Sequence, residues 1–195
     1  MPKHPKFDEQ EVLRRARDLF WRKGYAATSI QDLEQATGIK RSSLYNSFGG
    51  KRALYERTLR EYQRESRRSL PAPGPRAPAR LKAMLRRAIV RGDDTPLGCY
   101  LVNATTELAE TDAQMERFVA DNRESLVARF REFLAGAQGQ GELSPTADPE
   151  ALANFLFAGY NGLQVAVQTG MGRPELCAVA DRLIDSLDWT MTEED

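Results

Sequence analysis

The chain has 195 residues with 28 basic and 28 acidic side chains, so its formal net charge is zero. This length allows a helical core with one small appended domain. No segment approaches the roughly 20 apolar residues that cross a bilayer, and residues 1–6 lack the apolar core of a secretory signal, so we expect a cytoplasmic protein without membrane contact. The two cysteines, Cys99 and Cys177, lie far apart and His4 is the single histidine, so neither a zinc site nor a disulfide framework is indicated and no cofactor is expected.

The zero net charge hides a strong asymmetry along the chain. Residues 1–70 contain 16 Lys or Arg and 9 Asp or Glu, a net charge of +7, whereas residues 71–195 carry a net charge of −7. A basic segment of this kind is typical of a surface that meets nucleic acid. The first 70 residues are therefore where a nucleic-acid motif is expected.

A first helix is predicted over residues 8–23. Its apolar residues fall on one stripe, and Gly24 follows as a terminating glycine. The helix is expected to pack across the two that come after it. The stripe consists of Val12, Ala16, Leu19 and Phe20.

A second, shorter helix is predicted to begin at Ser29. Ser29 and Asp32 have the spacing of a capping box, in which a serine caps the helix and an acidic side chain three residues later reaches back to its start. Gly38 suits a left-handed helix end, so the chain is expected to turn there. Between these two signals the apolar positions recur every three residues, at Ile30, Leu33 and Ala36.

A third helix is predicted over residues 40–48, with Leu44 and Phe48 facing inward one turn apart. Its other positions are cationic or carry hydrogen-bonding side chains, the types that contact phosphates and base edges in a DNA major groove. The two short helices thus form a helix-turn-helix with an outward reading face. These positions are Lys40, Arg41, Ser42, Ser43, Tyr45, Asn46 and Ser47.

A fourth helix is predicted over residues 52–70, opened by Gly49-Gly50-Lys51-Arg52. The unpaired N–H groups at its start, helped by Lys51, suit a phosphate. The alternative is that Lys40, Arg41, Lys51 and Arg52 only solubilise a helical hairpin. Taken together with the helix-turn-helix pattern, these cations favour DNA contact.

The residues of the predicted N-terminal helices resemble the TetR family of bacterial transcriptional regulators. The resemblance covers about the first third of the chain specifically; the rest is similar only in length and helical pattern. It implies an all-α homodimer with a three-helix DNA-binding domain, residues 1–54, and an effector-binding and dimerisation domain of helices, residues 55–195. The resemblance is carried by Leu19-Phe20, Gly24-Tyr25, Thr28-Ser29-Ile30, Ile39-Lys40, Ser43-Leu44-Tyr45, Phe48 and Lys51-Arg52-Ala53-Leu54.

The resemblance also implies roles for individual residues. Ser29 and Lys51 match phosphate-contacting positions, and Tyr45 matches a tyrosine that packs on the sugar–phosphate backbone. Asn46 stands where many members have histidine or tryptophan, which leaves open whether it contacts a phosphate or nothing. Base-reading side chains are implied at Gln31, Arg41 and Ser43.

Further helices are predicted over residues 79–90, 99–108, 112–136, 148–169 and 174–189, after a proline-rich break at residues 71–75. Their spacing favours a helical bundle. The last two helices are either the surface through which a homodimer forms or part of the monomer core, and periodicity does not separate these alternatives. A protein that reads DNA as a pair requires two-fold symmetry, which favours the dimer.

A small-molecule effector is expected among the middle helices, in a mostly apolar pocket lined by Cys99, Asn103, Phe133, Tyr160 and Gln164. Cys99 near a helix start is either a thiol sensor of electrophiles or oxidants, or a small buried filler. An enzyme with Cys99 as nucleophile would need a base, and the one histidine lies in the N-terminal arm. A protein-interaction module without DNA binding is a second alternative. We expect a repressor that binds a roughly palindromic operator on double-stranded DNA and is released by the effector.

Overall fold

The computed structural model describes residues 7–68, 71–89 and 97–190. Within these ranges the regular secondary structure consists of helices and one isolated antiparallel bridge between Leu143 and Trp189. The all-α prediction is confirmed. The helices are α1 (Glu9–Lys23), α2 (Ile30–Thr37), α3 (Arg41–Phe48), α4 (Lys51–Arg68), α5 (Ala77–Ile89), α6 (Tyr100–Leu108), α7 (Ala113–Gly139), α8 (Pro149–Gln168) and α9 (Arg173–Asp185).

The ends of α1 and α2 lie where the capping residues predicted them. The Asp8 carboxylate accepts from the backbone N–H groups of the first turn of α1. The predicted capping box at α2 is confirmed: the Ser29 hydroxyl accepts from the Asp32 N–H at 3.1 Å, and the Asp32 carboxylate accepts from the Ser29 N–H at 2.7 Å. Gly38 ends α2 with φ of 73°, a left-handed conformation that glycine adopts without strain.

The described core has two parts. The first holds the apolar faces of α1 to α4 and also most of α6 and the start of α7, through residues such as Tyr100, Ala104 and Met115. The second lies between α5, α7, α8 and α9. Helix α6 therefore contributes its buried residues to the core that it shares with the N-terminal helices, although it follows α5 in the chain, and it also packs against α7 and α8.

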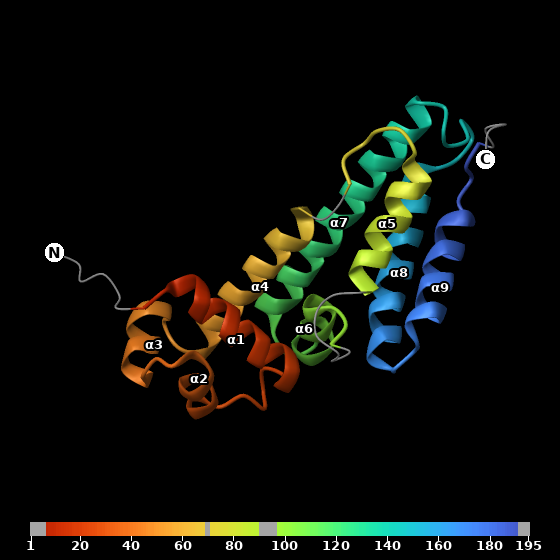
Figure 1. Ribbon diagram of the computed structural model, residues 1–195. Helices are drawn as coiled ribbons and strands as arrows, with labels where there is room; N and C mark the ends of the chain where they lie inside the picture. Colours follow the sequence, from red (N-terminus) through yellow and green to blue (C-terminus); the bar gives the residue numbers. More distant parts are fainter. Residues whose placement is uncertain (1–6, 69–70, 90–96, 191–195) are drawn as a thin grey trace.

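The arrangement is elongated (Figure 1). Helices α1 to α3 form a head at one end, α8 and α9 lie at the other, and α6 sits between them beside α4 and α7. Helix α4 leaves the head and extends toward the second core. Among the described residues no helix is long and apolar enough to cross a membrane.

Several helix boundaries differ from the predicted ones because distant residues decide them. Helix α5 begins at Ala77 rather than at residue 79, since the Glu142 carboxylate accepts from the N–H groups of Arg76 and Ala77 at 2.7 and 2.6 Å. Helix α9 ends at Asp185 rather than at residue 189, because the following residues pair with the α7–α8 turn. The predicted helix ends at residues 70 and 90 lie outside the described residues.

Candidate nucleic-acid interface and ligand cavity

Most of the side chains predicted to contact DNA are exposed at the surface of the head and of the start of α4. Leu44 and Phe48 anchor α3 in the first core, and the positions between them face outward. Ser43 and Lys51 are half-buried. The exposed ones are Ser29, Gln31, Lys40, Arg41, Ser42, Tyr45 and Asn46.

Tyr45 is the large exposed apolar residue of α3, 47% accessible. The Arg41 guanidinium lies 5.6 Å from the centre of its ring. A Cβ at Gly50 would come within 3.1 Å of the same ring, so the ring rests against the bend between α3 and α4, where Gly50 has a φ of 104°. Tyr45 is thus held in place at the surface without burial.

Lys51 opens α4, whose first N–H groups have no partner within the helix. The Lys51 Nζ lies 4.3 Å from the Tyr25 ring centre and donates to the Ala26 carbonyl at 3.5 Å. Burial lowers the pKa of Lys51, and Glu107 and Asp32 oppose that shift. A cation and N–H groups that have no partner within the helix therefore lie together at the start of α4, an arrangement that suits a phosphate.

The Ser29 hydroxyl is already engaged. It donates to the Asp32 carboxylate at 2.7 Å, and Lys23 Nζ lies 2.6 Å from the same carboxylate. The Lys23 hydrogen bond, followed by those from Ser29, holds the pKa of Asp32 far below its usual range. A phosphate at Ser29 would consequently meet a carboxylate that Lys23 neutralises.

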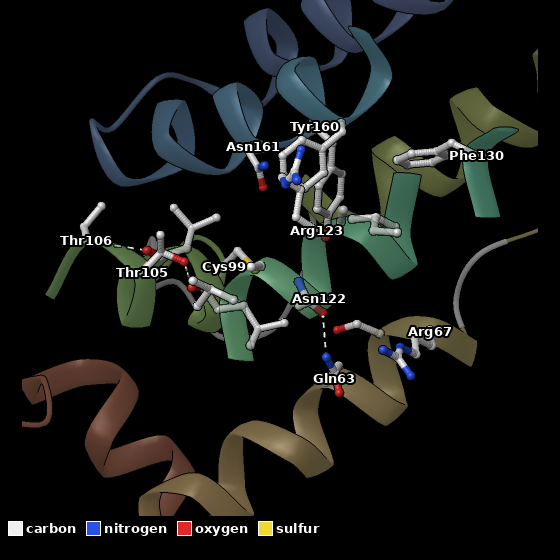
Figure 2. A pocket seen from close by; sticks show the side chains of 18 of the residues that line it. Gln63, Arg67, Cys99, Thr105, Thr106, Asn122, Arg123, Phe130, Tyr160 and Asn161 are labelled. Atoms are coloured by element: carbon white, nitrogen blue, oxygen red, sulfur yellow. Dashed lines mark hydrogen bonds between the residues drawn. The ribbon is translucent and has the colours of Figure 1, made fainter. Parts of the chain in front are cut away.

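A second feature is a cavity of about 570 Å³ between the two cores. Its lining comes from α4, α5, α6, α7 and α8, including Cys99 and Leu101 of the first core and Met84 and Phe130 of the second. Figure 2 shows α4 on one side of the cavity and α8 with Tyr160 on the opposite side. A ligand here would touch both cores.

The structure brings only part of the predicted effector set to this cavity. Cys99 and Tyr160 line it, whereas Asn103, Phe133 and Gln164 do not. The Asn103 side chain binds the Leu97 carbonyl and Gln168 instead. Phe133, 2% exposed, packs in the second core.

Gln164 is 2% exposed and lies where α8 passes close to the segment before α6. A Cβ at Gly98 would be only 2.6 Å from the Gln164 carbonyl oxygen, so these backbones touch at a glycine with φ of 63°. Gln164 thus lies beside Gly98 and is not among the residues that line the cavity.

Sequence reasoning missed most of the polar lining. These residues are Gln63, Ser66, Arg67, Arg87, Glu116, Asn122, Arg123 and Asn161. Polar residues on a helix are normally solvated, so periodicity did not separate them from surface positions. One signal was available on α4: Gln63 and Ser66 follow Tyr62 on the face that the buried residues of this helix define.

Helix α6 and its N-cap residue Cys99 are bonded to α4 and to the connection between α1 and α2. The Tyr62 hydroxyl donates to Cys99 Sγ at 3.7 Å, and the Thr58 and Tyr100 hydroxyls lie 3.0 Å apart. At the far end of α6, the Glu107 carboxylate accepts from the N–H groups of Tyr25 and Ala26 at 2.9 and 2.7 Å. The helix that lines the cavity therefore also holds the α1–α2 connection.

Comparison with known proteins agrees with this architecture. Residues 12–58 match the model described as bacterial regulatory proteins, tetR family, and residues 77–182 match the tetracyclin repressor-like C-terminal domain. The HTH-type transcriptional repressor ComR of Escherichia coli (strain K12) is 29% identical over 185 residues, covering 89% of this chain and 86% of that protein. The uncharacterized HTH-type transcriptional regulator YezE of Bacillus subtilis (strain 168) is 31% identical over 163 residues, 80% and 84% of the two chains.

Among solved structures, a cysteine mutant of the TetR family transcriptional regulator CifR, complexed with 26bp double-strand operator DNA, superposes with a TM-score of 0.83. It is 30% identical, and the match covers 95% of this chain and 99% of that one. These relatives are transcriptional regulators and not enzymes. The chain belongs to the tetR family of bacterial regulatory proteins and is a DNA-binding transcriptional regulator.

Proposed function

We propose that the protein is a homodimeric repressor that binds a roughly palindromic operator and leaves it when a small molecule occupies the cavity. The observation that carries this proposal is the position of α6, which lines the cavity, packs into the first core and is bonded through Glu107 to the α1–α2 connection. A molecule that displaces α6 would move the reading helix with it.

For the DNA contacts we propose that α3 lies in the major groove. Arg41 would read bases together with Gln31 and Ser43, and Tyr45 would pack on the sugar–phosphate backbone. Exposure of these side chains supports the assignment, with Ser43 half-buried. Phosphates would be held by Ser29, Lys51 and the outward polar positions Lys40, Ser42 and Asn46.

For the dimer we propose the outer face of α8 and α9. The buried residues of these helices, among them Leu156 and Ile184, fill the second core, yet an apolar set remains exposed. On α8 this set forms a stripe at helical spacing that includes two small residues and permits close helix contact. The exposed set consists of Phe155, Ala158, Gly162 and Val165 on α8 and Val179 on α9.

We retain the division at residues 54 and 55 as a proposal, with α4 shared between the two domains. The thiol-sensor hypothesis for Cys99 likewise stays a proposal. Cys99 lines the cavity but is only 4% exposed and accepts a hydrogen bond from Tyr62, which suits a packing role. Unchanged operator affinity after demonstrated alkylation of Cys99 would remove the sensor.

The proposed function is tested by fluorescence anisotropy with labelled DNA from immediately upstream of the protein's own gene. Scrambled DNA of the same length is the control, and both are titrated at several salt concentrations. Tight, selective and salt-sensitive binding is expected, because phosphate contacts release counterions. Equal weak binding to both DNAs would contradict operator recognition at that site.

A further inference from the structure

The polar groups of the cavity indicate which class of molecule it takes, an inference that rests on the cavity being the effector site. Ser66 and Arg67 lie next to each other on α4 and both line the cavity. The Ser66 Oγ and the Arg67 Nε are buried, and neither has a hydrogen-bond partner among the residues that the structure describes. Buried polar atoms are normally paired, so two adjacent unpaired donors beside the cavity would gain hydrogen bonds if their side chains turned toward a bound acceptor.

The charges of the residues that line the cavity also favour an anionic ligand. Three arginines, Arg67, Arg87 and Arg123, line the cavity against a single carboxylate, Glu116, among the residues described. Within the described residues Arg67 and Arg87 form no ion pair, and Arg123 has only a 3.9 Å approach to its neighbour Glu124. The described lining of the cavity therefore carries more positive than negative charge.

The remaining lining is largely aliphatic and aromatic. Leu101, Val102 and Thr105 of α6 lie on one side, and Val119, Leu126 and Phe130 of α7 continue the surface. Figure 2 shows Gln63 and Arg67 on α4, with Gln63 bonded to Asn122 across the gap. The side chain of Arg123 extends toward Tyr160 and Asn161 on the opposite side. The polar groups thus border an apolar interior at its edges.

We propose that the effector has an apolar body and one anionic head group of the carboxylate or sulfonate type, with the head bound by Arg67 and Ser66. An anion accepts from the buried Arg67 Nε and the Ser66 hydroxyl together and offsets the excess of arginine charge. A neutral molecule of the same shape leaves that charge uncompensated. The apolar body fills the space lined by α6 and α7.

The test uses two dyes that differ only in the sulfonate, 1-anilinonaphthalene-8-sulfonate and N-phenyl-1-naphthylamine. Their binding to the full-length protein is followed by fluorescence, and decanoate and decanol then compete for the site. The variants are Arg67→Gln and Ser66→Ala. Arg68→Gln is the matched control, because Arg68 is exposed on the same helix and does not line the cavity.

Wild-type protein is expected to bind the sulfonate at least about tenfold more tightly than the neutral dye, as hydrogen bonds to a charged group allow. Decanoate should compete better than decanol by a similar factor. Arg67→Gln should remove most of the preference and Ser66→Ala part of it, whereas Arg68→Gln should keep it. Unchanged affinity of both Arg67→Gln and Ser66→Ala for the anionic dye would overturn the assignment.

The outcomes separate this inference from the proposed function. If neutral and anionic probes bind equally well and both release the protein from its operator, the cavity is an effector site but the anionic class is wrong. If the anionic probe binds through Arg67 without changing operator affinity, the ligand class is supported and the release mechanism fails. If no probe binds, both the effector cavity and the inference that rests on it are overturned.

Discussion

Glu107 is the residue through which we expect the cavity helix to control the head. Its carboxylate accepts two backbone N–H groups, from Tyr25 and Ala26, at 2.9 and 2.7 Å. A hydrogen bond to a charged group contributes about 1.5–3 kcal/mol when buried, and Glu107 is exposed, so solvent reduces this value. We expect Glu107→Ala to lower the free energy of unfolding by about 1–2 kcal/mol for both bonds together.

The same substitution should also weaken operator binding. Without the carboxylate, the Glu107 hydrogen bonds no longer hold the α1–α2 connection to α6. The connection must then become ordered when the protein binds DNA, and this ordering reduces the binding free energy. A loss of up to about 1.4 kcal/mol corresponds to a tenfold weaker complex. Because the contact links α6, whose residues line the cavity, to the α1–α2 connection, Glu107→Ala should also reduce the change in operator affinity caused by a cavity ligand.

Urea unfolding and fluorescence anisotropy with operator DNA measure these effects. Glu110→Ala is the control, because Glu110 is exposed near the same helix end and no bond of its side chain is found among the described residues. Glu107→Gln should lie between wild type and Glu107→Ala, since an amide keeps one acceptor oxygen without the charge. If Glu107→Ala matched Glu110→Ala in stability, operator affinity and ligand response, the coupling role of Glu107 would be refuted.

Three further predictions concern the head and the dimer. Lys51→Ala should weaken binding to all DNA sequences and reduce the salt dependence, whereas Arg41→Ala should relax base preference by about 1–3 kcal/mol at one position; anisotropy on operator and scrambled DNA separates the two. Because the folded pKa of Asp32 is depressed, its carboxylate stabilises the fold above its ordinary pKa of about 3.9 and loses this contribution as pH falls. Urea unfolding should therefore show a stability difference between wild type and Asp32→Asn that is constant above about pH 5 and shrinks below about pH 4; a pH-independent difference would contradict this account. Ala158→Arg on the outer stripe of α8 should yield monomers by analytical ultracentrifugation, whereas Glu132→Arg on the exposed side of α7 should not; a dimeric Ala158→Arg protein would place the interface elsewhere.

The reading head could be predicted almost completely from the sequence because its signals are local. The capping box joins Ser29 to Asp32 within one helical turn, and Gly38 ends the same helix. The inward pair Leu44 and Phe48 is one turn apart, so its partners on α3 must face outward. Helix caps and apolar spacings that lie within one helical turn can be recognised from a short segment of the sequence.

The cavity could be predicted only in part. Cys99 and Tyr160 lie where expected, but the cationic lining of Arg67, Arg87 and Arg123 comes from three helices that the sequence alone does not bring together. Each of these arginines has the pattern of a solvated helix position. Their shared environment depends on how the two cores meet.

The sequence by itself thus determined the helical class, the helix-turn-helix and the outward face of α3, because each depends on residues a few positions apart. The tertiary structure decided that α6 packs with the head, that Glu107 holds the α1–α2 connection and that Arg67 borders a cavity. Tyr25 and Glu107 are 82 positions apart in the chain. Contacts over such separations leave no local period, and only the packing of the whole chain brings the partners together.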